Sequence, residues 1–149
     1  MAKGYNYAGQ FLNLLFARKT ITNIADDTAS APLTGLWVGL HATDPSTTGQ
    51  TGGGEGGYGA YARTLTTRST AGWALTSGTS TLPASISPVA AINFPQCVTT
   101  STGTFAFCSV GSTSAGVGNL YYVGAISPTI NFGSGVTPQI STGSSITEV

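Results

Sequence analysis

The sequence predicts an all-β fold, a β-sandwich or jelly roll with a short N-terminal α-helix. Only 7% of the residues are charged, against roughly 25% in a typical globular domain. Ser, Thr and Gly therefore provide most of the polarity; Thr suits strands, whereas Gly and Ser suit turns. Short apolar or alternating segments recur between Gly, Ser and Pro turns, which is the pattern of a sandwich or jelly roll.

A chain of 149 residues has the length of one domain of common size. We expect a single domain over residues 1–149, with a helix and connecting arm at 1–32 and the sandwich at 33–149. No internal repeat is visible that would indicate another architecture.

The segment Gly4–Lys19 is the one convincing helix in the sequence. Apolar side chains recur at a spacing of four and give it a broad apolar face. They are Tyr7, Phe11 and Leu15 in one row and Ala8, Leu12 and Phe16 in the next. We expect Arg18 and Lys19 in the last turn, where cations interact favourably with the helix dipole. A helix this short needs a packing partner, which is either its own sheet or another subunit.

A series of short strands is expected after the helix. A polar connection at Asn23–Pro32, which contains Asp26 and Asp27, leads to a buried strand at Leu36–His41. The later strands are expected at Ala60–Thr67, Trp73–Thr76, Val89–Phe94, Thr104–Val110, Asn119–Ile126, Thr129–Phe132, Val136–Ile140 and Ser145–Glu148. Because Ser-Pro favours a turn, we expect a hairpin through Ser127-Pro128.

A long loop is predicted at Ala42–Gly59. It opens with Asp44-Pro45, a turn signal, and six glycines lie between Gly52 and Gly59. Loops of this length inside compact domains are usually functional or mobile. A surface excursion and a contact arm are both compatible with this composition.

The charge pattern favours assembly with other proteins. Five Lys and Arg residues balance five Asp and Glu residues, and no charged side chain lies between Ser69 and Thr147. Such a surface is poorly suited to a solitary soluble protein. The alternative is a secreted domain hydrated by Ser and Thr. No basic stripe is present, so nucleic acid is not an expected partner.

Neither an export signal nor a membrane span is expected. The apolar stretch Phe11–Phe16 is short, contains Asn13 and is followed by Arg18 and Lys19 rather than a small-residue cleavage site. No segment approaches the roughly 18 consecutive apolar residues of a transmembrane helix. This absence of a signal lowers the expectation for the secreted alternative.

No metal or cofactor is expected. Cys97 and Cys108 are predicted to be two small buried thiols, with a disulfide between neighbouring strands as the alternative. One His and no Cys-x-x-Cys pair argue against a metal site. The segment GGGEGGYG lacks the Lys-Ser/Thr that completes a phosphate-binding loop.

The sequence offers little for catalysis. His41 is the sole imidazole, with Asp44 three residues beyond it, but no Gly-x-Ser-x-Gly motif positions a nucleophile. Asp26 and Asp27 are adjacent and would point to opposite sides of an extended chain. Glu55 lies among glycines, where we expect poor positioning. We therefore predict no enzymatic activity and no catalytic residues, and we expect His41 to be a hydrogen-bonded residue at a strand end.

Aromatic residues raise the alternative of a carbohydrate-binding platform. Trp37 and Tyr122 lie inside strand patterns and are expected to fill the core. Tyr58, in the glycine-rich loop, is the best candidate for an exposed contact residue. Such a platform, or a hydrolytic site, would require a pocket that holds His41 or several aromatic residues.

Three segments resemble a family of small tailed-bacteriophage virion proteins. LWVGLHATDPSTTGQ is similar to the family's strand-then-turn element, and GGYGAYAR to its Gly-Gly-x-Tyr-x-Arg element. GNLYYVGAISPTINFGSGVTPQI resembles the end of the family's sequence. The chain departs from the family at Cys97–Ser114, which lacks an expected Trp-Gly and an acidic residue. The resemblance implies a scaffold and no catalytic residues, with Tyr61 and Arg63 opening the strand after the loop.

The resemblance implies a virion structural protein that works by assembly. Our first hypothesis is a capsid decoration or cement protein at the capsid surface, with the major capsid protein and copies of itself, in a dimer or trimer, as partners. The alternative is a tail fibre or adaptor subunit, with host-glycan binding as a further role. Candidate contact residues lie on the helix and in or beside the glycine-rich loop. They are Tyr7, Phe11, Leu15, Glu55, Tyr58 and Tyr61.

Overall fold

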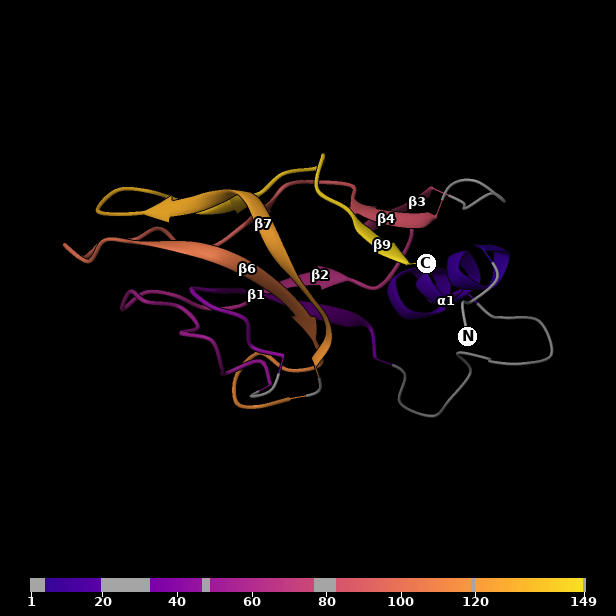
Figure 1. Ribbon diagram of the computed structural model, residues 1–149, viewed down its shortest axis with the longest axis horizontal. Coiled ribbons are helices and arrows are strands. Elements are labelled where there is room, and N and C mark those ends of the chain that lie inside the picture. The colour runs from indigo at the N-terminus through magenta and orange to yellow at the C-terminus, as the bar shows by residue number, and fades with distance from the viewer. Residues whose placement is uncertain (1–4, 20–32, 47–48, 77–82, 119, 149) are drawn as a thin grey trace. The chain divides into compact units, whose positions relative to one another are not determined.

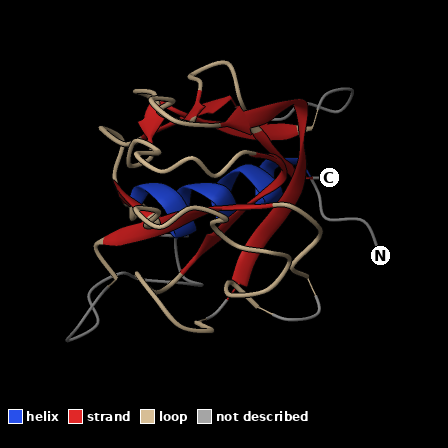
Figure 2. Cartoon of the chain, turned by 90° about the vertical axis from the view of Figure 1, so that its left-hand side faces the viewer, coloured by secondary structure: helices blue, strands red, loops and turns tan. Residues whose placement is uncertain are grey.

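The computed structural model describes residues 5–19, 33–46, 49–76, 83–118 and 120–148 (Figure 1). The chain forms two compact units, each assembled from separate stretches of sequence. The first unit draws on Met1–Gly35, Thr67–Ala91 and Ser141–Val149, and the second on Leu36–Thr66 and Ile92–Ile140. Strands dominate, and the described residues contain one short helix (Figure 2). The predicted all-β class with a short N-terminal helix is confirmed, while the division into 1–32 and 33–149 stays a prediction.

The first unit packs a helix on a small sheet. Its elements are α1 (Tyr5–Ala17), β3 (Trp73–Thr76), β4 (Ala84–Pro88) and β9 (Ile146–Glu148), with antiparallel strands in the order β3-β4-β9. Leu12 and Phe16 are fully buried, and the rings of Phe16 and Trp73 lie 4.5 Å apart between centroids. Burying a side chain of this size contributes about 1.5–3 kcal/mol. We expected the helix to pack either on its own sheet or on another subunit. The row that contains Leu12 and Phe16 packs on the sheet of its own unit.

The end of α1 differs from the prediction. The helix ends at Ala17, Arg18 adopts a left-handed backbone (φ 55°), and the Lys19 amide donates back to the Asn13 carbonyl. Arg18 and Lys19 therefore lie beyond the last turn, where we had expected them within it. A residue in the left-handed region breaks the helical hydrogen-bond ladder and commonly ends a helix.

A distant cation, Arg68, satisfies the carbonyls at this helix end. Its guanidinium donates to the carbonyls of Leu14 and Leu15, and to that of Leu33 at 3.0 Å. The Arg68 amide also donates to the Thr34 carbonyl at 2.9 Å. The last carbonyls of a helix lack intrahelical partners, so a buried cation here satisfies them and interacts favourably with the dipole.

The second unit contains a four-stranded sheet. Its strands are β1 (Gly35–His41), β2 (Thr64–Thr67), β6 (Gly103–Gly111) and β7 (Leu120–Phe132), in the order β2-β1-β6-β7, with a separate pair of β5 (Ile92–Asn93) and β8 (Gln139–Ile140). In the antiparallel pairing of β1 with β6, Trp37 is opposite Gly111 and His41 is opposite Phe107. This register places Gly39, Ser109 and Gly111 on the same face as His41. Three small residues thus leave that face open to a covering loop.

An aromatic cluster forms part of the core of the second unit. Phe105 and Phe132 stack with centroids 4.7 Å apart, and Tyr58 lies 5.3 Å from Phe132. Tyr61 stacks on Phe94 at 6.1 Å, with an interplanar angle of 9°. Tyr58 is only 6% exposed, so the expectation that it is an exposed contact residue is wrong. Although its sequence position is a loop, its ring belongs to the core.

Several predicted strands have different bounds in the structure. The segment Ala60–Thr67 is a strand only from Thr64, and Val89–Phe94 is one only at Ile92–Asn93. Strand β4 was not predicted at all. It reads Ala-Ser-Ile-Ser-Pro, and its alternation of buried and half-buried residues is short and formed by small side chains. The connection predicted at Asn23–Pro32 lies outside the described residues.

The predicted hairpin at Ser127-Pro128 is wrong, because β7 continues through it. Phe105 pairs with Ile130 and Phe107 pairs with Ala125, so four residues, Ile126–Thr129, lie opposite Ala106 alone. The Ser127-Pro128 bond is cis. The extra residues form a bulge of four residues in a continuous strand, and β7 and β6 run side by side in Figure 1.

Candidate functional site

A buried ion pair forms the centre of the polar residues in the second unit. Arg63 Nε lies 2.5 Å from Glu55 Oε1, and Arg63 Nη2 donates to Glu55 Oε2 at 2.8 Å. The Arg63 side chain is 1% exposed and that of Glu55 14%. Two parallel bonds between a guanidinium and a carboxylate make a strong and directional contact. Glu55 is thus held firmly, contrary to our expectation of a poorly positioned residue among glycines.

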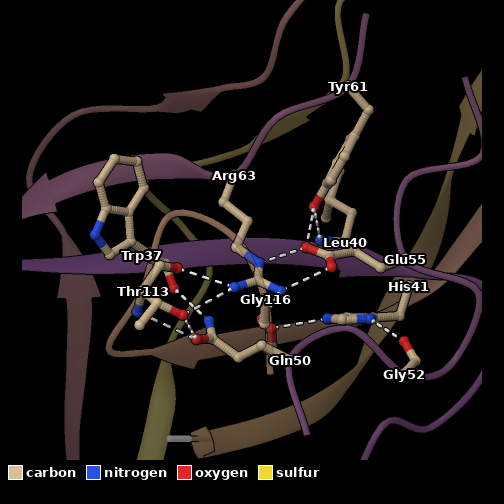
Figure 3. Close-up of polar contacts among 11 residues, drawn as sticks. Trp37, Leu40, His41, Gln50, Gly52, Glu55, Tyr61, Arg63, Thr113 and Gly116 are labelled. Atoms are coloured by element: carbon tan, nitrogen blue, oxygen red, sulfur yellow. Dashed lines mark hydrogen bonds and ion pairs between the residues drawn. The ribbon is translucent and has the colours of Figure 1, made fainter. Parts of the chain in front are cut away.

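The remaining donors of Arg63 bind a second loop, residues 112–118. Nη1 donates to the carbonyl of Thr113 at 3.0 Å and to its Oγ1 at 3.3 Å, and Nη2 donates to the Gly116 carbonyl at 2.9 Å. Figure 3 shows the guanidinium between Glu55 on one side and Thr113 and Gly116 on the other. All three guanidinium nitrogens are engaged, which a Lys side chain could not reproduce.

Gln50 makes a second connection between the two loops. Its Nε2 donates to the Trp37 carbonyl at 3.3 Å, and its Oε1 accepts from the Thr113 amide at 3.4 Å. The Gln50 amide donates to the Val117 carbonyl at 3.0 Å, and the residue is fully buried. A Cβ atom at Gly111 would lie 2.1 Å from Gln50 Cδ, so the side chain occupies space that only glycine leaves.

The glycine-rich segment turns back along the end of β1. The Thr43 amide donates to the Gly53 carbonyl at 2.9 Å, the Gly56 amide donates to the Leu40 carbonyl at 3.2 Å, and Glu55 forms a β-bridge with His41. Gly53 has φ +65°, and a Cβ there would meet the Thr43 carbonyl oxygen at 2.2 Å. The sequence was compatible with either a free surface loop or a contact arm. Gly53–Gly56 is not a free surface loop, because its main chain is hydrogen-bonded to the end of β1 and the residues that follow it.

His41 is fully buried beneath the glycine-rich segment and is hydrogen-bonded to its main chain at Gly52. Its Nδ1 lies 2.8 Å from the Gly52 carbonyl, which can only accept, so Nδ1 carries the proton and donates. Nε2 then accepts from the Ser109 hydroxyl at 2.8 Å. Burial lowers the pKa of His41 below its ordinary value, with the charges of Glu55 and Arg63 acting in opposite directions. The predicted role of His41 as a hydrogen-bonded residue at a strand end is confirmed.

Tyr61 links the ion pair to β1. Its hydroxyl accepts from the Leu40 amide at 2.8 Å and donates to Glu55 Oε1 at 3.5 Å. Burial raises the pKa of the Tyr61 hydroxyl well above its ordinary value, so the hydroxyl stays protonated and available as a donor. We call these connected residues the loop clasp: His41, Gln50, Glu55, Tyr61, Arg63, Ser109 and Thr113.

The polar groups of the loop clasp bind one another and the main chain. His41 and Ser109 resemble two members of a hydrolytic triad, but both are fully buried and the third position is taken by a backbone carbonyl. A triad places a carboxylate there to stabilise the imidazolium. Asp44 does not supply it: it is exposed, accepts from the Ser46 amide at 2.8 Å, and hydrogen bonds from Ser46 lower its pKa.

A small open hollow lies beside the loop clasp. Its volume is about 310 Å³. It is lined by Glu55, Tyr61, Ala62, Arg63, Ser114, Ala115 and Gly116. The charged groups at its wall, Arg63 and Glu55, bind each other and the chain.

The predicted contact residues fall in both units. Glu55 and Tyr61 meet in the loop clasp, while Phe11 and Leu15 are half-buried on α1. The side chain of Tyr7 lies outside the described residues. The contact roles of all six residues remain predictions. The sequence did not indicate that Gln50, Ser109 or Thr113 belongs to this site. The one signal that could have located the site is the pair of opposite charges at Glu55 and Arg63, eight residues apart in a chain with few charges.

Both cysteines are free thiols in the structure. Cys97 is fully buried, and its Sγ lies 3.6 Å from the carbonyl oxygens of Thr99 and Ser101. Cys108 is half-buried, and burial raises the pKa of its thiol. The disulfide alternative is therefore not observed, and the thiol prediction is confirmed, with Cys108 less buried than expected.

No group of three or more His, Cys, Asp or Glu side chains in the described ranges is placed to hold a metal ion. Within the same ranges, no helix has the length and apolar character needed to cross a membrane.

The chain is charge-poor and rich in strands, and the polar side chains of the loop clasp bind its own loops, as in a structural protein. Residues 11–147 match the family model described as podophage GP4 fiber I protein gp80, and the chain belongs to this family. It is therefore a bacteriophage virion structural protein, as the sequence resemblance implied. No curated protein matches the chain.

Proposed function

We propose that this protein is a non-enzymatic subunit of a phage tail fibre. The observation that carries the proposal is the match of residues 11–147 to a fibre protein family. This description favours the fibre alternative over our first hypothesis of a capsid decoration or cement protein. The proposed partners are other subunits of the tail and further copies of this chain, in place of the major capsid protein.

The geometry of the loop clasp supports a mechanical role. Residues 49–56 contact β1 at His41, Leu40 and Trp37, and buried bonds of Arg63 and Gln50 connect this segment to residues 112–118. A fibre subunit must transmit force and keep its shape while its neighbours hold it. Long loops that are bonded to the sheet at several points meet that requirement better than free loops would.

The absence of enzymatic activity has its own structural support. The nucleophile and base that resemble a triad, Ser109 and His41, are both fully buried and satisfied by the chain. Glycan binding has less support, because the hollow beside Tyr61 is small and its Arg63 and Glu55 groups bind each other. The proposed function is therefore assembly alone.

The test is the location of the chain on intact particles. Antibodies against the purified protein, visualised by gold labelling in electron microscopy, are expected to decorate the tail and leave the capsid surface clear. Labelled protein is also expected to sediment saturably with purified tails made without it, and not with purified heads. Decoration of the capsid surface and binding to heads would instead support the cement hypothesis and overturn the fibre proposal.

A further inference from the structure

The glycine-rich segment contains a short stretch, Thr51–Gly54, that lies between two firmly held residues; we call it the arch. On one side Gln50 is fully buried and bonded to Thr113, and on the other side Glu55 is paired with Arg63. The arch itself reads Thr-Gly-Gly-Gly and contains no buried residue. Hydrogen bonds of its main chain, rather than apolar packing, therefore keep the arch in place.

Three hydrogen bonds connect the arch to the end of β1. The carbonyls of its three consecutive glycines accept from the His41 ring at 2.8 Å, from the Thr43 amide at 2.9 Å and from the Ala42 amide at 3.4 Å. Segments with few buried apolar contacts open locally at a lower free energy than the whole fold. Of the three donors, only the His41 ring can gain a charge near neutral pH.

His41 lies where a positive charge would have no partner of its own. The described groups around the ring are two ionised side chains, one phenol and two uncharged residues of β6: Glu55, Arg63, Tyr61, Ser109 and Phe107. Glu55 and Arg63 already balance each other. A protonated His41 would therefore leave one unbalanced charge in a fully buried site, which is strongly unfavourable.

The hydrogen bonds of His41 do not remove this cost. In the neutral ring, Nδ1 donates to the Gly52 carbonyl and Nε2 accepts from the Ser109 hydroxyl (Figure 3). Protonation adds a hydrogen at Nε2, so the hydroxyl has to turn and accept instead. Both bonds can persist after that turn, but the closed site still supplies neither an anion nor water for the charge. Water reaches the ring once the arch is lifted.

We propose that protonation of His41 opens the arch in the otherwise folded protein, while Gln50 and Glu55 still hold its two ends. Opening uncovers the end of β1 at His41 and releases three glycine carbonyls as acceptors. The subunit then has a closed state near neutral pH and an open state in mild acid. This switch goes beyond the proposed function and does not depend on it, because opening of the arch is a property of the purified chain.

The first test is amide hydrogen exchange of the unmodified full chain, measured by NMR between pH 7 and pH 5, with each rate divided by the intrinsic rate at the same pH. The Thr43 amide donates to the arch and reports its opening, whereas the Gln50 amide donates to the Val117 carbonyl and reports the fixed end. An exposed His41 ring has an ordinary pKa of 6.5. Proton uptake by the open state should therefore reduce the protection of Thr43 about tenfold over this range.

The protection of Gln50 should stay within about twofold over the same range, because its bonds do not involve His41. Unchanged protection of Thr43 would overturn the proposal. Equal losses at Thr43 and Gln50 would overturn it as well, because they would show that the whole unit unfolds rather than the arch alone.

A second measurement follows the ring itself. The chain contains a single His, so the imidazole signals in an NMR titration belong to His41 without further assignment. Nitrogen shifts should place the proton on Nδ1 at pH 7, and the midpoint of the ring titration should coincide with the midpoint of the Thr43 loss. A ring that titrates while Thr43 stays protected would show that the closed site tolerates the charge, and the switch would be wrong.

Two variants complete the test. His41→Gln removes the titrating group, and the protection of Thr43 should then no longer depend on pH. The matched variant Asp44→Asn removes an exposed carboxylate that is bonded to Ser46, and it should keep the pH dependence of the unmodified protein. A pH dependence that survives in His41→Gln, or that disappears in Asp44→Asn, would contradict the assignment to His41. If His41→Gln does not fold, the two measurements on the unmodified chain still decide.

Discussion

At the scale of single residues, the loop clasp depends on the ion pair of Arg63 and Glu55, and loss of either partner should strongly reduce the free energy of unfolding. Arg63 is almost fully buried and uses all its nitrogens, so its removal leaves the Glu55 carboxylate with no cation. A buried ion pair adds little over a well-packed apolar pair, but loss of one partner is strongly destabilising. The ion pair therefore acts mainly by specifying where the two loops lie.

We predict that Arg63→Met destabilises the protein by about 3 kcal/mol, at the lower end of the range for buried pairs because Glu55 keeps some exposure. Glu55→Gln should also be destabilising, and the double variant should cost about 1–3 kcal/mol less than the sum of the single variants. Urea denaturation of the four proteins measures these differences. Strict additivity would show that Glu55 and Arg63 contribute independently.

His41 makes the stability of the second unit depend on pH. Its pKa in the folded protein is lowered by burial, so below its ordinary pKa of 6.5 the unfolded state binds more protons than the folded state. The stability that neutral His41 provides is present above that value and is lost as pH falls toward its folded pKa. The Asp44 contribution is lost at lower pH, because its ordinary pKa is 3.8.

We predict that the free energy of unfolding decreases between about pH 7 and pH 5, and that His41→Gln flattens this decrease while lowering stability at neutral pH. The measurement is urea denaturation across that pH range. As a control, Asp44→Asn should keep the slope of the unmodified protein. An unchanged slope in the His41→Gln variant would place the titrating group elsewhere.

At the scale of elements, α1 is completed by a residue far from it in the sequence. Arg68 follows β2 and satisfies the carbonyls of Leu14 and Leu15 at the end of the helix. The nearby cations, Arg18 and Lys19, are exposed beyond the last turn. The helix end is therefore secured only once the chain beyond β2 has been placed against it.

We predict that Arg68→Met destabilises the first unit by about 1–3 kcal/mol, because buried carbonyls lose their donor. Hydrogen exchange detected by mass spectrometry should show faster exchange in residues 5–19. The matched variant Lys19→Met changes an exposed cation and should stay within about 0.5 kcal/mol of the unmodified protein. Equal effects of the two substitutions would contradict a specific role for Arg68 at the helix end.

Local patterns in the sequence predicted the elements that depend on local chemistry. The spacing of Leu12 and Phe16 predicted the helix, and the apolar run before His41 predicted β1. The hairpin was mispredicted because Ser127-Pro128 is a turn signal in most contexts, whereas here pairing with β6 on both sides keeps the strand continuous. Tertiary pairing outweighed the local signal.

At the scale of the whole molecule, composition identified the class of protein but could not locate the site. The low charge and the Ser, Thr and Gly content predicted an all-β assembly protein, which the family match supports. The loop clasp joins Glu55 and Arg63 to Thr113, fifty positions beyond Arg63. No periodicity or motif links residues at that separation, so only the folded chain shows that they meet. The burial of Tyr58 could not be predicted from its loop sequence either, because the rings that bury it, Phe105 and Phe132, lie far away in the sequence.

The bulge in β7 also separates the strand into two independently registered parts. Gly124 is fixed against Cys108 on one side of it, and Ile130 against Phe105 on the other. A residue gained or lost within Ile126–Thr129 would change the size of the bulge while both pairings stay in place. We therefore expect a change of length in the middle of this strand to leave both the pairing of Gly124 and the ring of Phe132 in place, so that the middle of the strand, rather than its ends, tolerates insertions and deletions best.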